Sequence, residues 1–328
     1  MKTAIVILNF NGEDLLAKYL PAMIRHSAGA DIWVVDNAST DNSIDYVQNN
    51  FPAVKIIQND KNLGYSGGYN ASVRKIDADL LLLLNNDIMV DQPWVPQIQK
   101  HFQNHPEVGI AQPKILSEIF NKHFDYAGAA GGRIDFMGLP YCRGRVLDYC
   151  KEDQGQYNEV TSVEWASGAA FCIRKEVFLE LGGFDDDFFM HFEEIDLCIR
   201  AMANGWKIHY LGGSEVKHLG GATLPAGHPK KLFFNIRNSM LTYTKTLPLA
   251  VYPVWLLMRL GFDFLLGLYF LFSGRWRHTF AIVRAHHSFF YRFPAFWKKR
   301  TATFLPFQKT SVFFEYVKMK INPKYDIR

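Results

Sequence analysis

The sequence has little of what would place it among disulfide-rich, zinc-binding or nucleic-acid-binding proteins. Its four cysteines lie far apart and form no C-x-x-C pair, which argues against a zinc knuckle and against a dense disulfide framework and fits a reducing cytosol. The 36 Lys and Arg residues against 32 Asp and Glu leave a formal net charge of +4. This is too small for the clustered basic face of a nucleic-acid-binding domain, so we expect no nucleic-acid partner.

Long apolar runs are also missing. The first residues, MKTAIVILNFNG, contain only a short apolar run before Asn9 and no small-residue cleavage site, which predicts a first strand rather than a secretory signal. Two later apolar stretches, 246–258 and 263–274, are interrupted by Arg259 and Asp263. Neither approaches the ~18 residues of a spanning helix, so we expect no bilayer-crossing segment.

What is present is a globular composition. The chain has 328 residues with 48% hydrophobic and 15% aromatic content, enough for a large core. Short apolar runs at residues 4–8, 32–35, 54–57 and 80–84 alternate with amphipathic segments. Continuous apolar runs suit strands buried on both faces of a parallel sheet that helices cover. The sequence therefore predicts an α/β fold that begins βαβαβαβ, with the five leucines as a strand because they are too few for a helix.

The alternation of apolar runs and amphipathic segments is less regular in the middle of the chain. Residues 106–160 contain many glycines and predict a loop-rich or short-strand insertion. Residues 169–173 and 207–211 then read as strands. Beyond residue 246 the composition shifts, and residues 275–300 mix basic and aromatic side chains as a segment in a membrane interface does. We expect a catalytic domain over residues 1–245 and a helical, membrane-associating region over 246–328.

Polar residues directly after the predicted strands are candidates for a ligand site. In open α/β sheets, ligands bind beyond the carboxyl ends of the strands. Asp77 and Asp79 precede the leucine strand and lie roughly 16 Å from its other end, so they face away. The residues that follow the first, second and fourth strands are Asn9, Asp36, Asn37, Asn85, Asn86 and Asp87.

Each of these groups also has an ordinary structural role. Asp87 has the oxygen ligands that Mg²⁺ or Mn²⁺ prefers when it bridges a diphosphate, but an Asx turn or a helix N-cap explains it equally simply, and the same holds for Asp36. The glycine-rich NLGYSGGYN, which contains Gly64, could let backbone approach a nucleotide. It is neither a G-x-G-x-x-G nor a P-loop motif.

The run GGFDDDFFMHFEEID is a candidate catalytic segment. Glu193 and Glu194 open a predicted helix, where the macrodipole alone stabilises carboxylates by about 0.3–1 kcal/mol. The aromatic residues around them indicate partial burial, which would raise a carboxyl pKa toward the range of a general base. His218 follows the last strand as a second metal ligand, a phosphate contact or a purely structural histidine.

Taken in order, several segments resemble family 2 glycosyltransferases. They are VILNFNG, VVDNASTDNS, NLGYSGGYN, LLLLLNNDI, the run from Ser167 to Trp206, VKHLGG and RNSM. The resemblance covers roughly residues 3–240 and is closest to the bacterial rhamnosyltransferase-like branch that builds cell-surface polysaccharides. It implies a GT-A fold and inverting transfer of a hexose. The implied donor is a nucleoside-diphosphate sugar of the dTDP-rhamnose or UDP-sugar type, and the acceptor is a hydroxyl of a polysaccharide or polyprenyl-linked glycan.

The resemblance also implies roles for single residues. Asp36 would recognise the nucleotide base, Asp87 would end the metal motif, and His218 would complete the contacts to Mg²⁺ or Mn²⁺ or to the diphosphate. Glu194 stands where the family usually has the Asp of a Glu-Asp pair, its catalytic base. The residues expected at the nucleotide sugar are Asn9, Asp36, Asn37, Gly64, Asn85, Asn86, Trp165 and Arg237.

Two departures from the family pattern matter. Asn85 replaces the first acid of D-x-D, which leaves Asp87 as the only obvious carboxylate ligand. Glu194 is one methylene longer than Asp, and because Glu193 precedes it the two could exchange roles. A misplacement near 1 Å costs about a hundredfold in rate, so mutation separates these alternatives.

The sequence thus predicts a single displacement in which Glu194 takes the acceptor proton, at the cytoplasmic face of the membrane. Two other functions remain open. A nucleotidyltransferase would need a basic glycine-rich signature near the amino terminus, which NFNGEDLLAKYL does not offer. A non-catalytic protein that binds sugar nucleotides or polysaccharides would be insensitive to Glu194→Gln.

Overall fold

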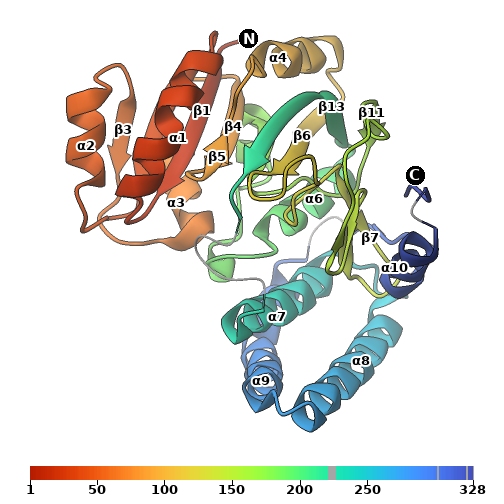
Figure 1. The fold of residues 1–328 in the computed structure, drawn as a ribbon. Helices are drawn as coiled ribbons and strands as arrows, with labels where there is room; N and C mark the ends of the chain where they lie inside the picture. Colours follow the sequence, from red (N-terminus) through yellow and green to blue (C-terminus); the bar gives the residue numbers. More distant parts are fainter. Residues whose placement is uncertain (221–226, 301–302, 323, 328) are drawn as a thin grey trace.

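The amino-terminal half alternates strands and helices, as the sequence predicts (Figure 1). The structure is a computed structural model that describes residues 1–220, 227–300, 303–322 and 324–327. The first elements are β1 (Thr3–Asn9), α1 (Glu13–His26), β2 (Asp31–Asp36), α2 (Ser43–Asn50), β3 (Lys55–Gln58), α3 (Gly64–Val73) and β4 (Leu80–Asn85).

These strands form one side of a nine-stranded mixed sheet. The order is β11-β13-β6-β12-β4-β1-β2-β3, with β5 paired to β13. β1 to β4 run parallel, whereas β12 is antiparallel to both β4 and β6. The added strands are β5 (Ile88–Met89), β6 (Val108–Ser117), β11 (Val160–Ser162), β12 (Ala170–Arg174) and β13 (Lys207–His218).

The five leucines of β4 show why this segment is a strand. Leu81 and Leu83 join the core cluster on the face of α3, whereas Leu80, Leu82 and Leu84 join the cluster on the face of α1. All five are fully buried. Side chains that alternate between two faces have the period of a strand. The fold class predicted from the apolar runs is therefore confirmed. The intervening helices are α4 (Val95–Asn104), α5 (Lys175–Glu180), the 3₁₀ helix η1 (Asp186–Phe188) and α6 (Glu193–Ala203).

The expected insertion over 106–160 is shorter than predicted. Ten of its residues form β6, which is buried throughout and lies inside the main sheet. Two buried polar side chains interrupt the apolar pattern of this strand. Gln112 accepts a hydrogen bond from the amide of Ser167, and Lys114 pairs with Asp153 at 2.6 Å. The rest forms a small sheet of β7 (Gly132–Ile134), β8 (Pro140–Cys142), β9 (Arg145–Val146) and β10 (Tyr149–Cys150).

The carboxyl-terminal third is helical, and it corrects one expectation. Most of the two apolar stretches, residues 252–258 and 263–272, lies in a single helix, α8, which is long and apolar enough to cross a membrane by length and composition, with a mean hydropathy of 1.7. Arg259 and Asp263 do not interrupt it, because they lie one turn apart and bind each other at 3.0 Å. The helices of this part are α7 (Pro229–Thr246), α8 (Tyr252–Phe272), α9 (Trp276–Lys298) and α10 (Val312–Ile321).

Candidate active site

The polar residues at the ends of β1, β2 and β4 lie together, as expected for residues that follow parallel strands of one sheet. β1 and β2 pair in parallel with Asn9 opposite Asp36. Asn9 Nδ2 lies 3.3 Å from Asp36 Oδ1, and Asn86 Nδ2 donates to Asn9 Oδ1 at 2.9 Å. Asn9 and Asp36 are both buried. Three loops are thereby fixed to one another at the carboxyl edge of the sheet.

Asp36 also has the structural role that its sequence context allows. Its Oδ2 accepts a hydrogen bond from the amide of Ser39 at 2.9 Å, as in an Asx turn, and Asn9 Nδ2 lies 3.3 Å from Ser39 Oγ. The turn and the bond to Asn9 hold the carboxylate in one orientation. A nucleotide base that met Asp36 would therefore meet a preorganised acceptor.

Gly64 joins the strand ends to the acidic segment. Asn37 Nδ2 donates to the carbonyl of Gly64 at 2.8 Å, and the next amide, that of Tyr65, donates to the carbonyl of Phe189 at 2.7 Å. Gly64 has φ +70°, and a Cβ there would lie 2.4 Å from the carbonyl oxygen of Phe189. Glycine is needed at this position both for the left-handed backbone and for the close approach.

Asp87 and His218 are brought together by a short antiparallel pairing. His218 lies opposite Ile88 in the pair of β13 and β5. Its Nε2 is 3.1 Å from Asp87 Oδ1 and 3.4 Å from Asn85 Nδ2, while its Nδ1 is 2.9 Å from Asp125 Oδ1. Burial alone would lower the pKa of His218, but the contacts with Asp125 and Asp87 outweigh burial and raise it to about 10.

The residues around Asp87 suit a divalent cation whose remaining ligands would come from a bound diphosphate. The described residues contain no cluster of three or more His, Cys, Asp or Glu side chains that could hold a metal ion. Asp87 Oδ1 is buried, and apart from its ion pair with His218 at 3.1 Å it has no hydrogen-bond partner in the part of the chain that the structure describes. Mg²⁺ is often bound by one or two carboxylates together with substrate phosphates. One carboxylate fits that arrangement, and the imidazole of His218 fits it once it loses the proton that its raised pKa favours.

The segment before Glu193 has an irregular backbone that other elements hold. Phe189, His191 and Phe192 all have positive φ, between 58° and 75°, a conformation that costs free energy for residues other than glycine. Asn238 of α7 offsets this cost. Its Nδ2 contacts the carbonyls of Phe188, Met190 and His191 at 3.3, 3.0 and 2.6 Å.

Cations from α7 and the region of α9 hold the start of the same segment. Asp185 binds Lys245 at 2.7 Å and Lys299 at 2.7 Å. Asp187 binds Arg292 at 2.7 Å and Lys299 at 2.9 Å. Burial would raise the pKa of Asp185, but Lys245 and Lys299 outweigh it and lower the pKa to about 2. The segment is therefore fixed by charges that come from later in the chain.

Glu193 and Glu194, which begin α6, differ in environment. Glu193 is buried, and burial followed by the charge of Glu194 raises its pKa well above 4.5. Glu194 is half-buried; burial raises its pKa to about 7, although backbone hydrogen bonds and the charge of Lys231 oppose the shift. One oxygen of each carboxyl group is buried and has no hydrogen-bond partner among the described residues. Burial therefore raises the pKa of both carboxyl groups, and that of Glu194 lies close to neutral pH.

Two residues expected near the donor or acceptor have structural contacts. Trp165 is buried against Gly132, where its indole nitrogen donates to the carbonyl of Arg133 at 3.0 Å. Arg237 lies 3.3 Å from the carbonyls of Asp187 and Phe188. The structure thus places Trp165 beside the small sheet and Arg237 beneath the acidic segment.

Sequence reasoning missed two polar residues at the site. Asp125 lies in the glycine-rich region that the sequence predicts as an insertion, and it orients the ring of His218. Asn238 is part of the RNSM motif, but no local pattern indicates that it reaches three carbonyls of another segment. Both become visible only when the sheet and α7 bring distant segments together.

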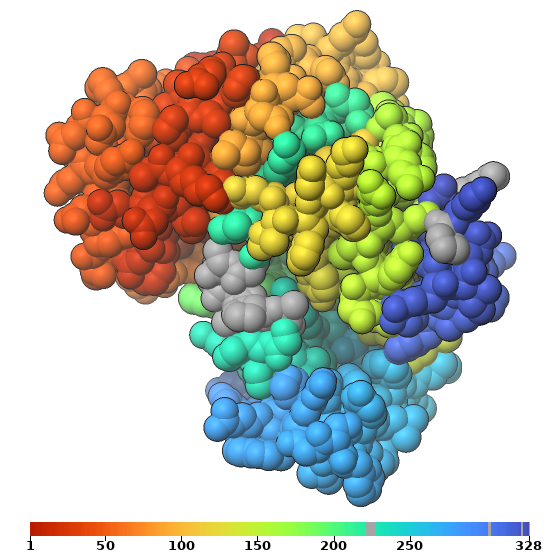
Figure 2. Space-filling model, in the orientation of Figure 1, coloured from red at the N-terminus to blue at the C-terminus, as the bar shows by residue number. Residues whose placement is uncertain are grey.

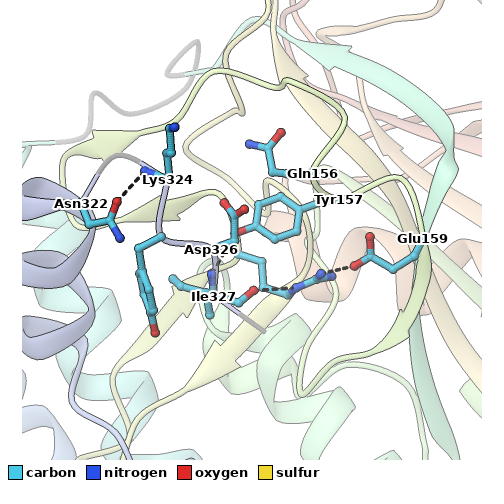
Figure 3. A pocket seen from close by; sticks show the side chains of 9 residues that line it. Gln156, Tyr157, Glu159, Asn322, Lys324, Asp326 and Ile327 are labelled. Carbon is cyan, nitrogen blue, oxygen red and sulfur yellow. Dashed lines mark hydrogen bonds and ion pairs between the residues drawn. The ribbon is translucent and has the colours of Figure 1, made fainter.

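A cavity lies away from these residues. Figure 3 shows it between the small-sheet region and the last residues of the chain, with a volume of about 650 Å³. Arg143 contacts Glu159 and the carbonyl of Ile327, and the amide of Ile327 donates to Tyr157 Oη at 3.0 Å. These side chains attach the carboxyl-terminal residues to the body of the protein.

Comparison with known proteins identifies the family of the part of the chain that contains the strand ends. The model of glycosyl transferase family 2 matches residues 4–182, more than half of the chain. The chain belongs to this family. The predicted membership is confirmed, and with it the general activity, that of a glycosyltransferase.

Curated relatives place this glycosyltransferase near the rhamnosyltransferases. The chain is 22% identical over 230 residues to the N-acetylglucosaminyl-diphospho-decaprenol L-rhamnosyltransferase of Mycobacterium tuberculosis (strain ATCC 25618 / H37Rv), which covers 65% of this chain and 75% of that protein. It is 33% identical over 75 residues to the rhamnosyltransferase WbbL of Escherichia coli (strain K12), or 23% of this chain and 26% of that one. The rhamnosyltransferase-like branch is confirmed.

Solved structures confirm the GT-A fold of this glycosyltransferase. GalNAc-T7 with UDP, GalNAc and Mn²⁺ superposes with a TM-score of 0.57 at 17% identity, covering 75% of this chain and 48% of that one. The mannosyltransferase PcManGT from Pyrobaculum calidifontis, in complex with GDP-Man and Mn²⁺, gives 0.53 at 12% identity and covers 88% and 87%. At these identities the likeness shows the fold alone.

Proposed function

We propose that this glycosyltransferase moves a hexose, with inversion, from a nucleoside-diphosphate sugar to a hydroxyl of a cell-surface polysaccharide or a lipid-linked glycan. The donor is of the dTDP-rhamnose or UDP-sugar type. The observation that carries the proposal is the hydrogen-bonded path from Asn37 through Gly64 and Tyr65 to Phe189. It ties the strand ends, where nucleotides bind in α/β sheets, to the helix that bears Glu194.

The strand ends bind the donor. Asp36 accepts a hydrogen bond from the base. The amides of Asn9, Asn37, Asn85 and Asn86, with the backbone at Gly64, line the nucleotide and its sugar. Support comes from the bonds that already fix these side chains to one another at one edge of the sheet.

Asp87 and His218 would hold Mg²⁺ or Mn²⁺ against the diphosphate. When bound, the ion neutralises the charge that develops on the leaving group. The buried Asp87 Oδ1, which pairs with His218 but accepts no hydrogen bond from the described residues, supports this assignment, as does the presence of Mn²⁺ in the two related structures above. Asp125 keeps the ring of His218 oriented so that Nε2 faces Asp87.

Glu194 acts as the general base. A base works best when its pKa lies near the operating pH, and burial brings the pKa of Glu194 to about 7. Glu193 is more deeply buried, and burial together with the charge of Glu194 raises its pKa well above the usual value, which favours Glu194 over it. The acceptor hydroxyl gives its proton to Glu194 as its oxygen bonds to the anomeric carbon. The bond from that carbon to the diphosphate breaks on the opposite face, which inverts the configuration.

Trp165 and Arg237 support the site rather than complete it. Arg237 contacts the carbonyls at the start of the acidic segment, so it helps to place Glu194. Trp165 covers Gly132 of the small sheet. The chain runs from Trp165 to Gly168, and the carbonyl of Gly168 accepts a hydrogen bond from Tyr65 at 2.8 Å.

We place the enzyme on the cytoplasmic face of the cell membrane, where nucleotide sugars and a polyprenyl-linked acceptor meet. The basic and aromatic composition of residues 275–300 supports this placement. The relative from Mycobacterium tuberculosis acts, by its name, on a decaprenol-linked acceptor.

The test is a panel of nucleotide sugars assayed for release of nucleoside diphosphate, with Mg²⁺, with Mn²⁺ and with a chelator. One donor class should be turned over by the wild type and bound but not turned over by Glu194→Gln. Release of pyrophosphate from a nucleoside triphosphate and a sugar phosphate would instead indicate a nucleotidyltransferase. Binding of donors without any turnover would indicate a binding protein.

A further inference from the structure

The outer face of α8 and α9 is apolar and unusually exposed. Only 22% of the apolar 18-residue stretch of α8 is buried inside the protein. Phe264 and Leu265 in the middle of the helix are 64% and 65% exposed, and Phe272 at its end is 85% exposed. In Figure 2 this part, coloured light blue, forms the lower end of the molecule, away from the amino-terminal strands. A soluble protein rarely exposes so many neighbouring large apolar residues without a partner.

The charges within α8 point away from this face. Arg259 is 3% exposed and Asp263 is fully buried. Besides binding Asp263, Arg259 donates to Ser239 Oγ at 3.1 Å, and Asp263 contacts His286 of α9 at 2.9 Å. The polar side of α8 therefore faces α7 and α9, and its outward side carries no charge over the whole helix.

Exposed apolar and aromatic residues continue the face onto α9, with cations around them. Trp276, Phe280, Phe290 and Tyr291 are each more than half exposed. The sequence from residue 264 to 314 contains eight Lys or Arg and no Asp or Glu. Three of the eight are bound within the protein, since Arg292 and Lys299 pair with Asp185 or Asp187 and Arg300 contacts backbone carbonyls, which leaves five for the surface. Aromatic rings and cations at the edge of an apolar face are typical of helices that lie in a membrane interface.

We propose that the outer faces of α8 and α9 form a docking surface that lies in the plane of an anionic lipid bilayer, with the apolar side chains in the interface and the cations against the head groups. The proposal deepens the membrane placement made above by naming the surface and the lipid charge. It does not require sugar transfer, so it can fail or succeed separately from the proposed activity.

The contacts of α8 favour an in-plane orientation over a spanning one. Tyr252 Oη lies 2.8 Å from Thr244 Oγ1 of α7, and Trp255 Nε1 donates to the carbonyl of Met137 at 3.0 Å. At the other end, Thr279 Oγ1 of α9 donates to the carbonyl of Gly267 at 3.0 Å. Both ends of α8 are thus attached to the body of the protein. A spanning helix would have to give up these bonds and bring Arg259 and Asp263 into the hydrocarbon.

The charge of the surface favours lipid over a second copy of the chain. A symmetric dimer through this face would bring two sets of exposed cations, among them Arg275 and Arg277, close to each other. Like charges that face each other oppose association. An anionic membrane instead attracts each Lys or Arg that lies near its surface.

The test is flotation of the full-length protein with vesicles of phosphatidylcholine alone or mixed with phosphatidylglycerol, without any sugar donor. We expect binding to the anionic vesicles that falls with added salt. Phe264→Glu with Leu265→Glu should lower the partition coefficient roughly ten- to a hundredfold, since each large side chain loses its burial. The matched control is Ile119→Glu with Phe120→Glu, an equally exposed pair between β6 and the small sheet, which should leave binding unchanged.

A second pair of variants tests the lipid charge without disturbing the apolar face. Arg275→Gln with Arg277→Gln should lower binding to the anionic vesicles roughly tenfold or more, whereas Lys61→Gln with Lys100→Gln should not. Three results would overturn the proposal: no binding to either kind of vesicle, resistance of the bound protein to alkaline carbonate extraction as for a spanning helix, or a dimer in sedimentation that the Phe264 and Leu265 substitutions dissociate.

Discussion

The two halves of the candidate site are built in different ways. The strand-end half rests on regular structure, since parallel strands of similar length bring Asn9, Asp36 and Asn86 to one edge. The half that carries Glu194 rests on an irregular segment with three left-handed residues, and α7 and the region of α9 hold it in place. We therefore expect changes in the first half to affect donor binding and changes in the second half to affect the chemical step.

The largest effect is expected from Glu194→Gln. Loss of the general base should lower kcat by roughly 10²- to 10⁴-fold and leave the dissociation constant of the donor unchanged, measured by calorimetry. Glu180→Gln, an exposed residue of α5, is the control and should retain full activity. A large loss of donor affinity in Glu194→Gln would show that the two halves are not separate.

The same residue should set the pH dependence of turnover. Because a base must be deprotonated and the pKa of Glu194 is raised to about 7, kcat should fall as the pH drops below about 7. Stability should change in the opposite direction. The folded state binds the proton more tightly than the unfolded state, so the free energy of unfolding should decrease between pH 4.5 and about 7. At pH 8 Glu194→Gln should unfold at a higher urea concentration than the wild type; equal midpoints would contradict this.

The next effect is expected from Asp87→Asn, at the strand-end half. Removal of the charged oxygen ligand should weaken Mn²⁺ binding in the presence of nucleoside diphosphate and lower kcat/KM about a hundredfold. Calorimetric titration with Mn²⁺ measures the first and steady-state rates the second. Asp77→Asn is the matched control, because Asp77 lies at the opposite end of the same strand and is exposed. Unchanged Mn²⁺ affinity in Asp87→Asn would remove Asp87 from the metal site.

A smaller effect is expected from Asn238→Ala in the second half. Three carbonyls of the segment before Glu193 would lose their donor, which should lower the free energy of unfolding by about 1–3 kcal/mol and kcat by roughly tenfold. KM for the donor should stay the same. Asn50→Ala, at the exposed end of α2, is the control. A rise in KM with unchanged kcat would place Asn238 on the donor side.

The smallest effect is expected from Asn86→Ala. One hydrogen bond to Asn9 would be lost, so KM for the donor should rise roughly two- to tenfold with no change in kcat. Steady-state kinetics with varied donor concentration measures this. A fall in kcat comparable to that of Asn238→Ala would remove the distinction between the two halves.

Much of the strand-end half could be predicted from the sequence, because an apolar run fixes where a strand ends and the next residues fix the site. β6 was missed because Gln112 and Lys114 are buried polar side chains whose partners, Ser167 and Asp153, are distant in sequence. α8 was misread for a related reason. The hydropathy of a sequence does not show which way a charged side chain points. Arg259 and Asp263 face the interior of the protein, where they bind each other.

The support of Glu194 could not be predicted, because it depends on packing between distant segments. The acidic run itself indicates a helix that begins at Glu193, which the structure confirms. Nothing local indicates that Asn238 reaches its carbonyls or that Lys299 reaches Asp185. The division into residues 1–245 and 246–328 stays a prediction based on composition.

The ring of Phe296 in α9 stacks on Phe188 of η1 at 5.7 Å, beside the cations that hold Asp185 and Asp187. A fragment that stopped after α7 would keep every residue matched by the family model and still lack these supports. Shortened forms of the protein, attractive for crystallisation or assay, should therefore be treated with care. The helical part that we place on the membrane therefore also supports the segment that leads to Glu194.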